Sequence, residues 1–546
     1  MSRLPSARYI LLPDEYFQAL EPAYHAVFGT GHLTWEWTTN PPIRSFAYPS
    51  LFVPAYALVK ALRLENTPIL IWAPKLVQVV FASAGDLALY QIACTLFTQS
   101  HGRVTLFLSL LSPFNVLALT RTLANSTETS LVTIALLYWP YSLFQTRRHF
   151  SNLVVDGTIV GLAAASAITI IDTLYYGALT FTPFSFLKTN LVSGVASFYG
   201  VNTFHYYFTQ GLPIVLGPSL PFTLLGVWKH IKDNRDNRNT SPSRRTRSLL
   251  LGLVAWTIAL YSLLAHKEWR FIHPLLPILH LFAADYLIYS NNETKKYATD
   301  LQAQDNLKAR LTFQLPIRRN HLAYFLAVCL PLNLYLIRWH GSAQIAVTRY
   351  LHDLSTRSDR VKSVGVLMPC HSIPGRAYLH LPELTYATGG HRIWEIGCEP
   401  PLGLSQYVLV MDLISFRHPL NRSRLSTQRE TYTSQTDVFF ETLGPIRYLD
   451  QYFPPSVDPT FPPSREPFTK PGNPPPVQGW NHTWPSHFIM FGALENLSSS
   501  SEIQDTVKQK LRGLGYDVVW RIGNGWEEDE RRRGGVVVWE WTGLKV

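Results

Sequence analysis

The front of this chain carries a series of apolar runs, each close to the length at which a helix crosses a bilayer. Such a helix needs about 20 residues, or somewhat fewer at the short end. We place the runs near residues 70–98, 104–120, 131–144, 153–176, 212–228, 248–265, 272–290 and 321–338. A further run at 51–64 is shorter and carries Pro54 and Lys60, so we interpret it as a helix lying in the membrane interface. The sequence thus predicts an α-helical polytopic membrane body over residues 70–338, with about eight spans.

Basic loops between the runs predict the orientation of this body. Lysine and arginine gather in the segments 229–247 and 291–320 and at Arg147 and Arg148. Cytosolic loops carry an excess of these residues, so we place all three regions on the cytosolic side. Counting crossings then assigns to the lumen the segments 1–69, 121–130, 177–211 and 266–271 and the chain after 338. We attribute the net charge of +11 to this topology and not to nucleic-acid binding, because no nucleic-acid recognition motif accompanies it.

After Arg338 the sequence becomes polar and rich in Pro, Gly and Ser, which indicates a separate luminal domain over residues 339–546. Its two β-rich runs, Tyr516 to Ile522 and Val536 to Trp541, are separated by a charged turn region that contains glycine. This pattern predicts a hairpin-like pair of strands in a small α+β domain. Sequons on the predicted luminal side are candidates for glycosylation: Asn421, Asn481 and Asn496.

The same domain begins with a group of cysteine and histidine residues: Cys370, His371, His380, His391 and Cys398. A zinc site needs four closely placed ligands, and these spacings match no familiar zinc pattern. An oxidising lumen favours a disulfide between Cys370 and Cys398 instead. We therefore expect no metal, with a zinc site as the alternative.

Two acidic residues, Asp14 and Glu15, begin an aromatic, partly helical stretch on the predicted luminal side that also contains His25. A carboxylate in such a position can take the proton from an attacking hydroxyl group. The alternative is structural, because acids at a helix N-terminus are stabilised by the helix dipole.

A second charged cluster, HKEWRF at 266–271, lies where one predicted span reaches the lumen and the next begins. His266, Lys267 and Arg270 could neutralise a phosphate leaving group, and charge at a membrane boundary is costly unless it is used or solvated. The alternative is that these basic side chains extend to the interface simply to stay solvated. Arg121 lies in another predicted luminal loop.

The predicted luminal loop around 197–213 combines aromatic and amide side chains and contains His205 and Gln210. Such groups suit a sugar at a bilayer surface, and an aromatic belt is the alternative. Asp86 lies within an apolar run, where a carboxylate is either functional or bonded to a neighbouring helix.

HKEWRF is similar to the HKExRF signature of glycosyltransferase family 22, the dolichyl-phosphate-mannose-dependent α-mannosyltransferases with the GT-C fold. PDEYFQALEPAYHAVFG at 13–29 and RTLANSTE at 121–128 resemble two further blocks of that family, and the resemblance extends to about Cys398. It implies a multi-pass mannosyltransferase of the endoplasmic reticulum membrane with a luminal active site, dolichyl-phosphate-mannose as donor and no cofactor. The family pattern places a helix before the acidic loop, and because only thirteen residues precede Asp14 we expect that helix to be missing here.

Three stretches resemble the branch of the family that acts on GPI-anchor precursors: LTWEW at 33–37, SFYGVNTFHYYFTQGLP at 197–213 and MPCHSIP at 368–374. This resemblance implies addition of the third mannose, in α-1,2 linkage and with inversion. A related enzyme acting on a lipid-linked oligosaccharide, or adding the fourth GPI mannose, is the nearest alternative. An inactive assembly subunit or a lipid transporter would be of another class. A transporter predicts repeat symmetry and broken helices, and the sequence indicates neither.

The resemblance also implies roles for individual residues. Asp14 would be the general base, with Glu15 as the second choice. The donor phosphate would be bound by basic side chains of two loops: His266, Lys267, Arg270 and Arg121. Further contacts with the substrates are expected from His25, Glu268, His205 and Gln210.

Overall fold

The structure is a computed structural model, in which two compact units can be distinguished. It describes residues 13–145, 150–192, 194–236, 241–301, 315–385, 392–400, 434–464, 482–500, 503–527 and 529–543. Five residues singled out above lie outside these ranges: Arg147, Arg148, His391, Asn421 and Asn481. Of the described residues, the first unit comprises those within Pro74–Ile170 and Tyr199–Ile337, and the second comprises residues 13–73 together with those within Ile171–Phe198 and Arg338–Val546.

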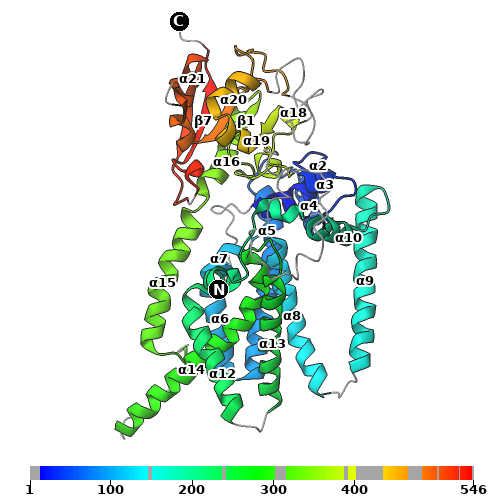
Figure 1. Ribbon diagram of the computed structural model, residues 1–546, viewed down its shortest axis with the longest axis vertical. Helices are drawn as coiled ribbons and strands as arrows, with labels where there is room; N and C mark the ends of the chain where they lie inside the picture. Colours follow the sequence, from blue (N-terminus) through cyan, green and yellow to red (C-terminus); the bar gives the residue numbers. More distant parts are fainter. Residues whose placement is uncertain are drawn as a thin grey trace, which may run out of the picture. The chain divides into compact units, whose positions relative to one another are not determined.

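The first unit consists mainly of long helices, some of which extend beyond its boundaries (Figure 1). Every apolar run named above falls on helix: α5 (Ile69–Leu96), α6 (Gln99–Leu111), α7 (Pro113–Ala118), α8 (Ala124–Gln145), α9 (Phe150–Tyr176), α11 (Leu212–Leu216), α12 (Leu220–Asp236), α13 (Pro242–Ser262), α14 (Leu276–Leu301) and α15 (Arg319–Arg338). Among the described residues, five segments have the length and composition to cross a membrane: Ile69–Leu96, Val154–Tyr176, Tyr207–Arg235, Trp269–Thr294 and Arg319–Arg357.

Two of the predicted spans are interrupted, and here the expectation of unbroken helices was wrong. The run at 104–120 is divided between α6 and α7, and that at 212–228 is divided by the short 3₁₀ turn η6 (Gly217–Ser219). A proline lies at each break, Pro113 and Pro218, and proline has no N–H with which to continue a helix but fits its first turn. Ser112 caps the new helix α7 by accepting a hydrogen bond from the backbone N–H of Asn115.

Helices α12 and α14 approach each other closely at Gly226 of α12. A Cβ atom added at Gly226 would overlap the backbone carbonyl of Phe282 in α14. We expect Gly226→Ala to force these helices apart and to cost about 1–3 kcal/mol of stability. Gly252→Ala in α13 is the matched control, because a Cβ there meets no atom within 4 Å. Thermal unfolding in detergent should show a lower Tm for Gly226→Ala alone, and equal Tm values would contradict this account of the packing.

The acidic stretch in the second unit folds as one continuous helical run. It consists of α1 (Pro13–Glu15), the π-helical turn η1 (Tyr16–Leu20) and α2 (Glu21–Phe28), and it ends at Gly29, whose φ of 74° suits glycine. Short helices follow: α3 (Trp35–Thr38), η2 (Pro49–Leu51) and α4 (Val53–Ala61). At nine residues α4 is too short to cross a bilayer, and its position in the membrane interface stays a prediction.

A five-stranded sheet forms the centre of the C-terminal part of the second unit. Its strands lie in the order β2 (Ile393–Glu395), β1 (Val364–Leu367), β3 (His487–Phe491), β7 (Val536–Trp541) and β6 (Tyr516–Ile522). β1 runs parallel to both β2 and β3, whereas β7 is antiparallel to β3 and β6. The predicted pairing of the two C-terminal strands is confirmed. A separate two-stranded ribbon joins β4 (Ser498–Ser500) and β5 (Ile503–Thr506).

Both faces of this sheet are covered, which explains why most residues of its central strands are apolar. Successive residues of β7 alternate between two cores, with Trp539 in one and Val538 in the other. Helices α20 (Pro445–Tyr452) and α21 (Val507–Gly513) supply the core around Trp539, and α16 (Ser342–Arg357) supplies the other. The sheet domain is therefore a three-layer structure, in which both faces of a central strand are buried.

Candidate active site

The two candidate acids differ sharply in exposure. Glu15 is completely buried, whereas the side chain of Asp14 is only partly covered. Both belong to α1, and the π-helical turn η1 follows them directly. Such turns are often found at functional sites. Because a general base has to reach the proton that it removes, the exposure favours Asp14 over Glu15.

His25 lies on α2, in the same helical run as the two acids. It is partly buried, and this burial lowers its pKa. The imidazole is therefore mostly neutral at pH 7, so one ring nitrogen can accept a hydrogen bond from a hydroxyl group. This property suits the predicted contact with a sugar.

The HKEWRF segment joins α13 to the 3₁₀ helix η7 (Trp269–Leu275) in the first unit. Glu268 brings the predicted phosphate-binding residues together. Its Oε1 lies 2.9 Å from Nε2 of His266 and 2.8 Å from Nη2 of Arg270. The other ring nitrogen of His266, Nδ1, is 2.9 Å from the carbonyl oxygen of Gly200. One carboxylate thus aligns two cationic groups, and its charge offsets part of theirs.

Lys267 has other hydrogen-bond partners. Its ammonium donates to the carbonyl oxygen of Asn202 at 2.8 Å and to that of Leu264, and the residue is only 3% exposed. Asn202 reciprocates by donating its side-chain amide to the carbonyl of Lys267 at 2.8 Å. In this arrangement Lys267 joins the loop before η5 (Tyr207–Gly211) to the HKEWRF segment. Its predicted contact with the donor phosphate would require these bonds to be exchanged.

The other predicted residues of the first unit differ in accessibility. Arg121 is completely buried in the turn between α7 and α8, where its backbone N–H donates to the carbonyl of Ala118. His205 and Gln210 are exposed, and Nδ1 of His205 lies 3.2 Å from Oγ1 of Thr209. The basic cluster is therefore well formed around Glu268, with His266 and Arg270 as its two basic members.

A buried polar chain beside the HKEWRF segment was not predicted. Nε2 of His273 lies 3.1 Å from Oδ1 of Asn115, and the amide of Asn115 donates to Oγ of Ser109 at 3.0 Å. Ser109 in turn donates to Asp86 at 2.7 Å. Asp86 therefore has the neighbouring-helix partner that the structural alternative required. The chain links α5, α6, α7 and η7, and of its four members only Asp86 stands out in the sequence.

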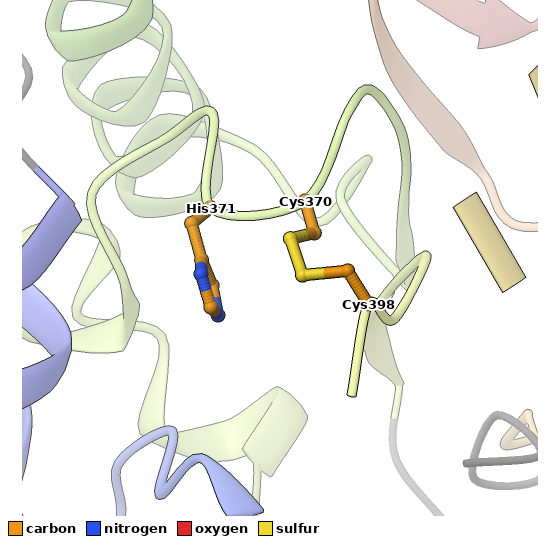
Figure 2. A group of neighbouring side chains, drawn as sticks. All are labelled: Cys370, His371 and Cys398. Carbon is orange, nitrogen blue, oxygen red and sulfur yellow. A yellow bond between two sulfur atoms is a disulfide. The ribbon is translucent and has the colours of Figure 1, made fainter. Parts of the chain in front are cut away.

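Cys370 and Cys398 form a disulfide with their Cα atoms 5.9 Å apart. Figure 2 shows His371 beside it, and the three side chains lie close enough to be considered as metal ligands. The two sulfur atoms are bonded to each other, however, so they are not thiolates that can bind a metal. The ring of His380 instead faces the hydroxyl of Tyr24, 2.7 Å from Nδ1.

The pair formed by His266 and Glu268 predicts a pH dependence. Its hydrogen bond with Glu268 raises the pKa of His266, so the imidazolium persists to higher pH than in an isolated histidine. The stabilising charge is present below the ordinary pKa and is lost as the pH rises through the raised one. We expect kcat/KM for the donor to fall over that upper range, and Glu268→Gln to move the fall to lower pH. A pH–rate profile with the same upper limb in both proteins would contradict this.

The sequence profile of the Alg9-like mannosyltransferase family matches residues 3–155 and 141–380. The chain belongs to this family. It is therefore a mannosyltransferase, a hexosyl-transferring enzyme, and its helical membrane unit with an attached sheet domain is the predicted GT-C glycosyltransferase architecture.

The names of individual relatives are more specific than the name of the family. The chain is 30% identical to GPI mannosyltransferase 3 of Yarrowia lipolytica, over 96% of this chain and 92% of that protein. It is 31% identical to GPI alpha-1,2-mannosyltransferase 3 of Bos taurus, over 79% of this chain and 78% of that protein. Among solved structures, ArnT from Cupriavidus metallidurans bound to undecaprenyl phosphate is similar with a TM-score of 0.43 and 11% identity, covering 72% of this chain and 83% of that one.

Proposed function

We propose that this chain adds the third mannose, in α-1,2 linkage, to a GPI-anchor precursor, with dolichyl-phosphate-mannose as the donor. The cluster of His266, Glu268 and Arg270 is the observation that carries the proposal, because it offers paired cations for a phosphate leaving group. Family membership supports mannosyl transfer, and the names of the relatives support a GPI precursor as acceptor.

The proposed reaction is a single displacement with inversion. Asp14 takes the proton from the 2-hydroxyl of the acceptor mannose, whose oxygen then attacks C1 of the donor mannose. The bond from C1 to the phosphate oxygen breaks, and dolichyl phosphate leaves with its added negative charge. His266 and Arg270 would stabilise that charge. Arg121 and Lys267 would be secondary, because both side chains are buried.

The remaining candidate residues would orient the substrates. His25 would contact the acceptor near Asp14, while His205 and Gln210 offer exposed polar groups to a sugar. Glu268 would act through its two cationic neighbours. We place the reaction on the luminal side of the endoplasmic reticulum membrane, where the positive-inside rule puts these segments.

Purified protein in detergent or vesicles tests the acceptor directly. Labelled dolichyl-phosphate-mannose is supplied with GPI precursors that carry one, two or three mannoses and with a mannosylated dolichyl-diphosphate oligosaccharide. We expect transfer to the two-mannose precursor, with product label released by an α-1,2-mannosidase and with activity retained in EDTA. Transfer to the oligosaccharide or to the three-mannose precursor would replace the proposed acceptor. Loss of activity in EDTA, with recovery on adding a divalent metal, would contradict metal-independent transfer.

A further inference from the structure

Glu21, two turns after Asp14 in the same helical run, is a completely buried carboxylate that accepts two backbone hydrogen bonds. Oε2 accepts from the N–H of His32 at 2.6 Å, and Oε1 accepts from the N–H of Ala377 at 2.7 Å. Burial raises the pKa of Glu21, and the two N–H groups oppose that effect. The carboxylate thus joins the acidic helical run to a segment about 350 residues later in the chain.

Residues 371–380, which we call the clamp segment, contact the acidic run at three further points. The ring of His371 packs on Phe17 with centroids 4.3 Å apart, and that of Tyr378 meets Tyr16 edge-on at 5.1 Å. Burial lowers the pKa of His380 to about 4, so its neutral ring can accept the Tyr24 hydroxyl at 2.7 Å. These contacts fall within and after the π-helical turn that follows Asp14 and Glu15.

Gly375 fits the clamp segment to Glu21. A Cβ atom at Gly375 would overlap the Glu21 carboxylate, so no other residue type leaves that carboxylate in place. The backbone at Gly375 has a φ of −69°, which any residue can adopt. Glycine is therefore needed because the backbone at this position lies directly against the Glu21 side chain. An added methyl group would displace the carboxylate end of Glu21 rather than the backbone.

One link attaches the clamp segment to the sheet domain, and a second attaches the loop after the acidic helical run. The disulfide joins Cys370, directly before the segment, to Cys398 beyond β2. Nδ1 of His32 lies 3.0 Å from Oε1 of Glu395 in β2. Burial alone would raise the pKa of Glu395, but the neighbouring His32 outweighs it and keeps the value at about 2. The pair joins the loop after the acidic helical run to β2.

We propose that the clamp segment is a positioning element of the active site and that Glu21 is its main positioning residue. The C-terminal part of the chain would then set the position of the helical run that carries Asp14. This inference rests on the proposed role of Asp14 as the base. A displacement of about 1 Å at a reacting group can cost roughly 10²-fold in rate, so a contact two turns away can control transfer without touching substrate.

The test compares kcat and KM of the full chain and its variants in vesicles. Glu21→Gln keeps the size of the side chain but places an amide N–H₂ against one of two N–H donors. We expect kcat to fall about 10- to 100-fold, with KM for dolichyl-phosphate-mannose unchanged. Glu441→Gln is the matched control, since Glu441 is 66% exposed and forms its ion pair with Arg531, at 3.4 Å. Equal kcat values for the two variants would overturn the proposal.

A rescue experiment separates positioning from general stability. Gly375→Ala should lower kcat as Glu21→Gln does, and adding Glu21→Asp should restore part of it, because the shorter side chain makes room for the methyl group. If Glu21→Gln does not fold, Tyr24→Phe takes its place, since it removes only the hydroxyl bonded to His380. We expect a smaller fall in kcat for this variant. Absence of rescue, or Tyr24→Phe with normal kcat, would count against the clamp. Asp14→Asn runs in parallel: normal transfer by that variant would overturn the base assignment instead.

Discussion

Asp14→Asn should reduce mannosyl transfer by about 10²–10⁴-fold, the usual contribution of a general base. The amide cannot take the proton from the acceptor hydroxyl, while it retains the size of the carboxylate. Because the change leaves the basic cluster intact, binding of dolichyl-phosphate-mannose should be nearly unchanged. The measurement is the initial rate of transfer at saturating donor, together with donor binding to the same preparation.

Asp359→Asn is the matched control for this substitution. Asp359 is 90% exposed and pairs with Lys362 in the sheet domain, away from the acidic helical run in sequence. It should transfer mannose at the normal rate. Normal transfer by Asp14→Asn would remove Asp14 from the mechanism, and Glu15, although completely buried, would then be the next candidate.

Arg270→Gln should lower kcat/KM for the donor by about 10²–10³-fold, the usual cost of removing one group that stabilises developing negative charge. The loss should be larger in kcat than in donor affinity, since the leaving phosphate gains charge only as the bond breaks. Arg270→Lys should recover only part of the activity, because an ammonium group cannot reproduce the planar fork of donors. Steady-state kinetics with varied donor measure both effects.

Arg349→Gln provides the control for a lost guanidinium. The side chain of Arg349 is 65% exposed on α16 and lies 3.9 Å from Asp353, so its removal should cost little. An Arg270→Gln enzyme with wild-type kcat and a raised donor KM would contradict the proposed role in the transition state. It would indicate uniform binding of the phosphate in the ground and transition states instead.

Apolar runs were sufficient to predict the helices of the membrane unit. A spanning helix forms all its backbone hydrogen bonds within one segment, so one continuous apolar stretch of sequence is enough to indicate it. The breaks at Pro113 and Pro218 were missed although both prolines are visible, since a proline can also be accommodated inside a helix, as Pro331 is in α15. The β6–β7 hairpin was predicted from its two local runs. Strands β1 and β2 were not, because four- and three-residue parallel strands have no turn signal and pair with distant partners.

In the candidate site too, local patterns were predicted and contacts with distant partners were not. HKEWRF and the pair Asp14–Glu15 were found as local patterns, and their residue types already indicate phosphate binding and proton transfer. The direction of the Lys267 ammonium was not predictable, since its acceptor Asn202 lies 65 residues earlier. The roles of Glu21 and His273 depend on partners 356 and 158 residues away. Long-range contacts of this kind leave no periodicity in a single sequence.

Complementation of cells that lack GPI mannosyltransferase 3 tests the central proposal most directly. Wild-type chain and Asp14→Asn are expressed to equal levels, and GPI intermediates are analysed together with GPI-anchored protein at the cell surface. We predict that the wild-type chain converts the accumulated two-mannose intermediate to the three-mannose form and restores surface anchoring, whereas Asp14→Asn leaves the intermediate in place. Persistence of the two-mannose intermediate with the wild-type chain, or equal restoration by both proteins, would contradict the account.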